Sequence, residues 1–109
     1  MSLDKVQEYR TCLEERMFTI LSELNISFVE QHPTKEGFVV DFAIFKNNRQ
    51  TKIAIEVDGL IWHSSTKSKR HDRFKDYKLK QSGWIVIRFD ENFTKDEVIK
   101  KITSLLILI

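Results

Sequence analysis

Apolar positions follow helical spacing in three stretches of the chain and cluster as short runs in four others. The first helical pattern covers 6–24 and ends near Asn25, a residue type that often stops a helix. Apolar runs at 26–31, 38–45 and 52–57 predict three strands, with polar turns at 32–37 and 46–49 between them. A second helix is predicted over 70–81, with Phe74, Tyr77 and Gln81 on one side, and Gly83 closes it. The run 84–89 predicts a fourth strand, and a capping box at 94–97 opens a last helix.

This order of elements predicts an α/β fold. The strands at 38–45 and 52–57 are close enough in sequence to form a hairpin. The strand, helix and strand that follow predict a parallel crossover beside that hairpin. The expected architecture is therefore a sandwich, with a mixed central sheet flanked by helices. A chain of 109 residues is the size of one domain, so we expect a single domain over 1–109.

Composition and the chain ends add a few restrictions. Cys12 is the only cysteine, so no internal disulfide can form, which fits a reducing cytosol. The first residues lack the apolar segment of a signal peptide. The apolar run at 104–109 is far shorter than the ~20 residues that a membrane-spanning helix needs. We therefore expect a cytoplasmic protein without a membrane partner, and 104–109 is either the buried end of the last helix or a cut inside a longer chain.

Positive charge is concentrated in one stretch. Residues 67–80 hold seven Lys and Arg against two Asp, a local charge of +5 in a chain whose net charge is +2. A basic stripe on a nearly neutral domain is the pattern expected for a partner with a phosphate backbone. A solvated helix face would look the same, so charge alone leaves the two interpretations even.

Two acids interrupt strands that are otherwise apolar. Asp41 lies within the strand at 38–45, and Glu56 lies at the end of the strand at 52–57. Burying an ionised carboxylate costs several kcal/mol unless a partner compensates it, and two neighbouring carboxylates repel each other. A divalent cation between them removes both costs, and hard cations such as Mg2+ prefer carboxylate oxygens. The alternatives are acids at an exposed edge, or acids held by Arg88 or Lys52.

Three further polar residues are candidates around these acids. His63 follows Glu56 by seven residues and titrates near neutral pH, which suits proton transfer, although a lone loop histidine is more often a surface group. Asp72, near the expected start of the basic helix, suits the helix dipole there and could also orient His63 or hold a metal-bound water. Glu14 lies at the margin of the first apolar stripe, where Glu15 fits the spacing equally well.

Taken together, these segments resemble a known family over 11–89. The segments that carry the resemblance are Val40-Asp41-Phe42, Ile55-Glu56-Val57-Asp58-Gly59, Trp62-His63, His71-Asp72-Arg73 and Gly83-Trp84-Ile85-Val86-Ile87-Arg88-Phe89. They resemble the very-short-patch-repair-like branch of the PD-(D/E)xK nucleases. Glu14, Asp41, His63 and Asp72 are similar to the EDxHD set of phage homing endonucleases, and spacing to the following Asn25 favours Glu14 over Glu15.

The resemblance implies a restriction-endonuclease-like fold that hydrolyses DNA with Mg2+, for which Mn2+ can substitute. Asp41 would be the central metal ligand, Glu56 the second acid, and the carbonyl of Val57 a backbone ligand. Asp58 stands where the wider family has its catalytic lysine, so His63 or a second metal would have to replace that lysine. The repair-enzyme branch also lacks the lysine and uses a histidine. Its Cys-rich zinc site is excluded here by the single cysteine.

The expected activity is cleavage of double-stranded DNA. Asp41 and Glu56 would hold the metal, His63 would move the proton, and Glu14 and Asp72 would position waters or a second ion. Phosphates would be contacted by five cations of the basic stretch, Lys67, Lys69, Arg70, Arg73 and Lys80. A domain this small is expected to dimerise or to work with a separate DNA-specificity region, in a phage-infected or bacterial cell. The alternatives are an inactive nuclease fold that binds DNA, an RNA-cleaving enzyme and a plain structural domain.

Overall fold

The chain folds into one four-stranded sheet with helices on both faces. A computed structural model describes residues 11–58 and 66–108, without the side chains of 66–69 and 108. In chain order the elements are α2 (Cys12–Glu23), β1 (Val29–Pro33), β2 (Val39–Lys46), β3 (Thr51–Asp58), α4 (Thr66–Gln81), β4 (Trp84–Asp90) and α5 (Lys95–Leu108). The predicted order of elements is confirmed.

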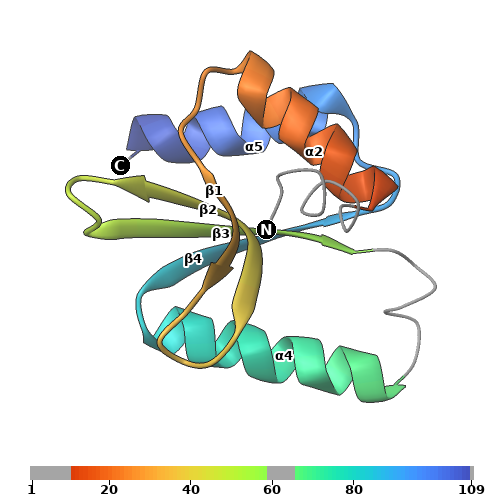
Figure 1. The fold of residues 1–109 in the computed structure, drawn as a ribbon, viewed down its shortest axis with the longest axis vertical. Coiled ribbons are helices and arrows are strands. Elements are labelled where there is room, and N and C mark those ends of the chain that lie inside the picture. The colour runs from red at the N-terminus through yellow and green to blue at the C-terminus, as the bar shows by residue number, and fades with distance from the viewer. Residues whose placement is uncertain (1–10, 59–65, 109) are drawn as a thin grey trace, which may run out of the picture.

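The sheet is mixed. Its strands lie in the order β1-β2-β3-β4, with β1–β2 and β2–β3 antiparallel and β3–β4 parallel. Helices α2 and α5 cover one face, and α4, which connects the two parallel strands, covers the other (Figure 1). The predicted hairpin and parallel crossover are both present, and the α/β prediction is confirmed.

Local sequence signals explain where several elements begin and end. Thr11 and Glu14 form a capping box at the start of α2, and Asn25, with φ of 55°, follows its end. Gly83, with φ of 90°, lies between α4 and β4, where a side chain would be strained. The first turn of α5 is capped by Thr94, whose Oγ1 accepts a hydrogen bond from the Glu97 amide.

Several predicted boundaries were wrong. The first helix was predicted from 6, but α2 begins at Cys12, because Thr11 is extended and caps it. β1 begins at Val29 rather than at 26, because Ile26 and Phe28 pack against the core before the strand starts to pair with β2. β1 also extends to Pro33, which an outer strand tolerates. α4 begins at Thr66 rather than at 70, because its first turn is polar and so lacks the apolar periodicity used to locate the helix.

The two faces of the sheet differ in how apolar they are. The face under α2 and α5 holds the larger core, centred on Phe42, Ile55 and Phe89. The face under α4 holds a smaller cluster that includes Leu79 and Trp84. The predicted side of α4 with Phe74 and Tyr77 is its outer side, because these rings are 54% and 58% exposed. Leu79 on α4 is buried, and Asp72, Lys75 and Asp76 are half-buried.

No helix within the described part of the chain is long and apolar enough to cross a membrane.

Candidate active site

Asp41 and Glu56 lie side by side where β2 and β3 stop pairing. The last backbone pair joins Phe42 to Ile55, so Asp41 and Glu56 are the next residues outward. Oδ2 of Asp41 accepts a hydrogen bond from the Val57 amide at 2.9 Å, which occupies the gap between the strands. Gln31, opposite Asp41 in the β1–β2 register, has φ of 48°, so the outer strand is also irregular here. The sheet therefore brings two acids together at a place where its strand pairing is irregular.

Glu56 is the most unusual acid described. Its side chain is only 4% exposed. Burial, followed by the charge and hydrogen bond of Asp41, raises the pKa of the Glu56 carboxyl to about 8, while Lys75 acts in the opposite direction. Asp41 acts on Glu56 in this way because the two carboxyls are close neighbours on one side of the sheet.

Lys75 on α4 is the residue that sequence reasoning missed. Its Nζ lies 2.6 Å from Oε1 of Glu56 and donates a hydrogen bond to the Val39 carbonyl at 2.8 Å. In the sequence, Lys75 is only one of the seven cations of the basic stretch. The available signal was its position one helical turn before Leu79, the buried residue of α4, which puts both side chains on the inner face.

The donor set around Glu56 suits a hard divalent cation. Despite the nearby ammonium of Lys75, Oε1 of Glu56 is buried without a well-aligned hydrogen bond, so it retains unused acceptor capacity. Mg2+ is commonly held by one or two carboxylates together with waters and substrate phosphates, and Asp41 and Glu56 supply two. Within the described residues there is no cluster of three or more His, Cys, Asp or Glu suited to a metal. The fit therefore rests on this pair.

Arg88 organises a second group of acids beside the first. Its Nη1 donates to both oxygens of Asp58 at 3.0 and 3.1 Å, and its Nε and Nη2 donate to Asp76 at 2.7–3.2 Å. Burial lowers the pKa of the Arg88 guanidinium, but hydrogen bonds and charge from Asp76 and Asp58 outweigh burial and leave the pKa above its ordinary value. Both carboxylate oxygens of Asp58 therefore accept hydrogen bonds from Arg88.

The expected alternative partners of the two acids have other contacts. Arg88 bonds Asp58 and Asp76 as described, and Nζ of Lys52 donates to the Ser82 carbonyl at 2.8 Å. The cation that does pair with Glu56 is Lys75. Glu56 thus does form an ion pair, but its partner is Lys75 on α4 and not one of the two strand cations that were considered.

The remaining predicted site residues are placed differently. Asp72 does not open α4 but lies in its second turn, because the helix starts earlier than predicted, and it is 3.8 Å from Nη2 of Arg88. Glu14 accepts hydrogen bonds from the Thr11 amide and from Nε2 of Gln31. Gln31 in turn lies opposite Asp41 in the sheet register. His63 lies outside the described residues.

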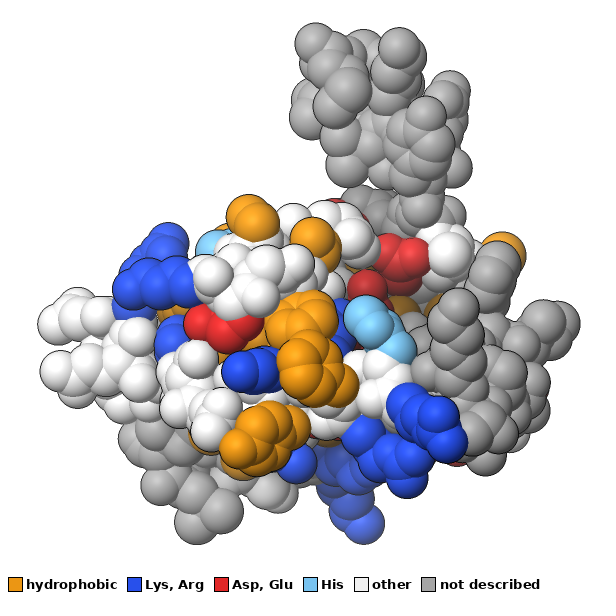
Figure 2. Space-filling view, turned by 90° about the horizontal axis from the view of Figure 1, so that it is seen from below, with side chains coloured by type: hydrophobic (Ala, Val, Ile, Leu, Met, Phe, Trp, Pro, Cys, Tyr) orange, Lys and Arg blue, Asp and Glu red, His pale blue; other side chains and the backbone are white. Residues whose placement is uncertain are grey.

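The predicted DNA contacts fall on the outer side of α4. Arg70, Arg73 and Lys80 are exposed, while the side chains of Lys67 and Lys69 lie outside the described set. Figure 2 looks onto this face and shows Lys and Arg side chains beside exposed apolar ones. The cations therefore lie on the same side of the sheet as the helix that carries Lys75.

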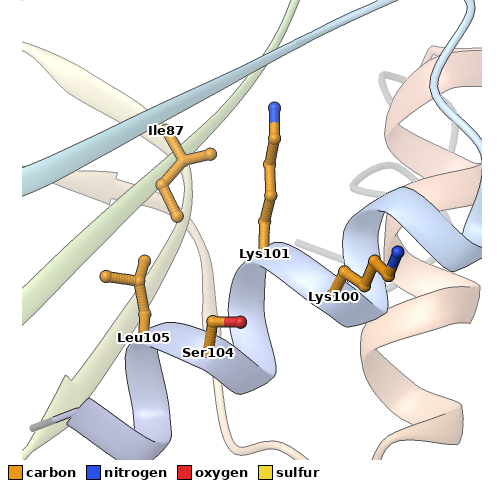
Figure 3. A pocket seen from close by; sticks show the side chains of 5 residues that line it. All are labelled: Ile87, Lys100, Lys101, Ser104 and Leu105. Atoms are coloured by element: carbon orange, nitrogen blue, oxygen red, sulfur yellow. The ribbon is translucent and has the colours of Figure 1, made fainter.

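A hollow on the opposite side of the sheet is a poor candidate for metal chemistry. It has a volume of about 460 Å³ and lies between Ile87 on β4 and four residues of α5 (Figure 3). Its lining, Ile87, Lys100, Lys101, Ser104 and Leu105, contains no carboxylate. A divalent cation prefers the oxygen ligands at Asp41 and Glu56.

Comparison with known proteins agrees with the fold. A family model, REase_MTES_1575, matches residues 13–106, a range that contains Asp41, Glu56, Lys75 and Arg88. Neither the curated proteins nor the solved structures gave a match. The matched family is restriction-endonuclease-like, and membership indicates a nuclease with DNA as its substrate. The chain belongs to this restriction-endonuclease-like family, REase_MTES_1575.

Proposed function

We propose that this chain is a Mg2+-dependent endonuclease of double-stranded DNA, with Asp41 and Glu56 as its metal-binding pair. The observation that carries the proposal is the contact between these two carboxyls, one of which is buried with a pKa of about 8. Such an arrangement is costly in a metal-free protein and becomes favourable when a divalent cation neutralises it. We further propose that the chain is one catalytic domain of the EDxHD, very-short-patch-repair-like type.

The backbone supports a third ligand at the same point. The amide of Val57 faces Asp41, and the N–H and C=O of one strand residue point toward the same neighbouring strand. The Val57 carbonyl is therefore the backbone oxygen best placed to join Asp41 and Glu56 around an ion. When bound there, Mg2+ would act as a Lewis acid toward the scissile phosphate.

Lys75 supplies the positive charge that Asp58 cannot. Asp58 stands at the usual lysine position but is bound to Arg88. The ammonium of Lys75 on α4 lies 2.6 Å from Oε1 of Glu56, and the Lys75 side chain is 13% exposed. An ammonium at this point can donate a hydrogen bond to the attacking water or to a phosphate oxygen, and stabilise the negative charge of the transition state. We assign this role to Lys75.

His63, Glu14 and Asp72 have supporting roles in the proposal. His63 acts as the base for the attacking water or as the acid for the leaving oxygen. Glu14 acts through Gln31. Oε2 of Glu14 accepts a hydrogen bond from Nε2 of Gln31 at 2.8 Å, and this bond stabilises the strand opposite Asp41. Asp72 contributes to the acids around Arg88, and through Arg88 it helps to hold α4 against the sheet.

DNA would approach from the α4 side. The exposed cations Arg70, Arg73 and Lys80 contact backbone phosphates, joined by Lys67 and Lys69. Such contacts give affinity that does not depend on base sequence, so a second copy of the chain or a separate specificity region would complete recognition of a long site.

The specific alternative is an inactive nuclease fold that still binds DNA. The pairing of Glu56 with Lys75 favours it, because that ammonium already compensates part of the charge that a metal would neutralise. Both proposals predict DNA binding, so only cleavage distinguishes them.

Digestion of supercoiled plasmid in Mg2+ tests the proposal. The parent protein should nick or linearise the plasmid, and Asp41→Asn should abolish cleavage while retaining DNA binding. Glu97→Gln, on α5 and far from the acids, is the matched control and should cleave like the parent. Structured RNA in a parallel reaction should remain intact. Duplex binding without cleavage by the parent would favour the inactive module, and cleavage by Asp41→Asn would refute the metal assignment.

A further inference from the structure

A second hollow lies under the β1–β2 loop, apart from Asp41 and Glu56. It has a volume of about 280 Å³, at the small end of the range for ligand pockets. Its walls come from the end of β1, the loop after it, the turn between β2 and β3, and the starts of β3 and β4. The residues that matter below are His32, Lys35, Glu36, Phe45, Arg49 and Trp84.

Three aromatic rings form one wall of this hollow. The centroid of His32 lies 5.2 Å from that of Phe45 and 6.0 Å from that of Trp84, and Phe45 and Trp84 are 5.6 Å apart. Phe45 and Trp84 also belong to the apolar cluster under α4, which fixes their positions. Trp84 is only 5% exposed and backs the wall, while His32 and Phe45 are half-buried and offer the ring surface on which a planar group can stack.

Three cations line the hollow: Lys52, whose Nζ donates to the Ser82 carbonyl, and Arg49 and Lys35. The guanidinium of Arg49 lies 4.5 Å from the centroid of Phe45, and Lys35 is exposed beside it in the lining. Within the part of the chain that the structure describes, neither forms an ion pair with a carboxylate. Such cations beside an aromatic wall favour a ligand that is both planar and anionic.

Glu36 places an unused hydrogen-bond acceptor in the same lining. Its Oε1 is buried and accepts no hydrogen bond from the described residues, which is a cost that native proteins rarely leave uncompensated. The loop that carries Glu36 is held in place, because Thr34 exchanges hydrogen bonds with Phe38 at 2.8–3.2 Å. The backbone that carries this acceptor is therefore held in place, and a donor from a ligand would satisfy the acceptor.

We propose that this hollow binds one unpaired nucleotide of the DNA, with a base that carries an exocyclic amino group. The ring stacks on the aromatic wall, Lys35 and Arg49 meet the phosphate, and Glu36 accepts from the amino group, as acids do from cytosine. This inference rests on the proposed nuclease function. His32 pairs with Val40, the neighbour of Asp41, so β1 and β2 connect the hollow to the acids, and the bound nucleotide contributes sequence preference at a position away from the cleaved bond.

Fluorescence titration tests the proposal without cleavage or metal. In a Trp62→Phe variant of the full chain, the remaining tryptophan is Trp84 in the wall. Titrated dCMP and dAMP should change its emission at lower concentrations than dTMP, which has no amino group. Glu36→Met, which removes the acceptor but keeps the length, should weaken dCMP binding by roughly tenfold, the usual effect of losing a hydrogen bond to a charged group. It should also remove the preference over dTMP.

The controls separate binding from folding and from nuclease function. Glu36→Met should not lower the melting temperature, because its buried oxygen has no partner to lose among the described residues. Glu97→Met on α5 should leave dCMP binding unchanged. A duplex with a single-stranded cytosine overhang should compete with dCMP more strongly than one with a thymine overhang. Equal binding of the three nucleotides, no effect of Glu36→Met, or failure of the overhang to compete would overturn the proposal, whatever the plasmid assay shows.

Discussion

At the scale of single residues, the main feature is an acid that holds its proton into the alkaline range. Glu56 is buried, faces the charge of Asp41, and is only partly compensated by Lys75. A cation must displace that proton to bind, so metal affinity should rise with pH. Protonation of Glu56 should therefore link stability to the proposed metal binding.

The pKa of Glu56 predicts a stability that falls as pH rises. Between the ordinary value of 4.5 and about 8, the folded protein keeps a proton that the unfolded chain has released. The free energy of unfolding therefore decreases across this window, by roughly 1.4 kcal/mol per pH unit at most, and stops decreasing above it. Glu56→Gln should flatten this dependence. Urea unfolding with chelator at several pH values checks it, with Glu97→Gln as control, and equal slopes in parent and Glu56→Gln would contradict it.

Lys75 should matter for catalysis far more than its neighbours on α4. Lys75→Met removes the ammonium beside Glu56 and should lower plasmid cleavage by roughly 10²–10³-fold, as for other groups that stabilise transition-state charge. Lys78→Met is the matched control, because Lys78 is exposed and lies 5.7 Å from the Phe74 ring. Full activity in Lys75→Met would exclude the catalytic role.

The sequence predicted the acids of the site but not their cation. Asp41 and Glu56 stand out because each interrupts an apolar strand, and this cost is visible without coordinates. Lys75 resembles the other six cations of its stretch, and only the rotation of α4 about its axis separates it from them. That rotation is set by Leu79 and the small cluster beneath it, which are tertiary contacts.

At the scale of elements, Arg88 joins β3, β4 and α4. It lies on β4 and bonds Asp58 on β3 and Asp76 on α4, with its side chain 22% exposed. Because Asp76 follows Lys75 directly, the same contact sets where Lys75 meets Glu56. The order of elements was predictable from local patterns, but this contact was not, since α4 separates the participating strands in sequence.

Removing Arg88 should therefore destabilise the fold. Arg88→Met leaves two partly buried acids without their partner and should lower the free energy of unfolding by about 3–5 kcal/mol. Lys101→Met, which breaks an exposed pair with Glu97, should stay within about 0.5 kcal/mol of the parent. Chemical denaturation measures the free energy of unfolding of both variants. Equal losses in the two would show that the Arg88 cluster does not stabilise the fold.

At the scale of the whole molecule, the two faces of the sheet have different tasks. The α2 and α5 face carries most of the apolar core, and the α4 face carries the acids, Lys75 and the exposed cations. Most of the apolar packing therefore lies on the face opposite the proposed chemistry. DNA binding should accordingly depend on α4 and be insensitive to α5.

Salt dependence of duplex binding tests this separation. Replacing Arg70, Arg73 and Lys80 together with Gln should weaken binding and reduce the slope of log affinity against log salt by roughly 0.9 for each phosphate that is no longer neutralised. Lys100→Gln, an exposed cation on α5, should leave the slope unchanged. If Lys100→Gln lowered duplex affinity as much as the α4 variant does, DNA would bind at another surface or in no fixed orientation.

Calorimetric titration of Mn2+ at about pH 8.5 tests the central claim, that Asp41 and Glu56 together hold a divalent cation. Near this pH part of the Glu56 population is still protonated, so binding should release protons, seen as a dependence of the heat on buffer ionisation. The account predicts saturable binding by the parent and its loss in both Asp41→Asn and Glu56→Gln. Unchanged binding in these variants, or none in the parent, would contradict it.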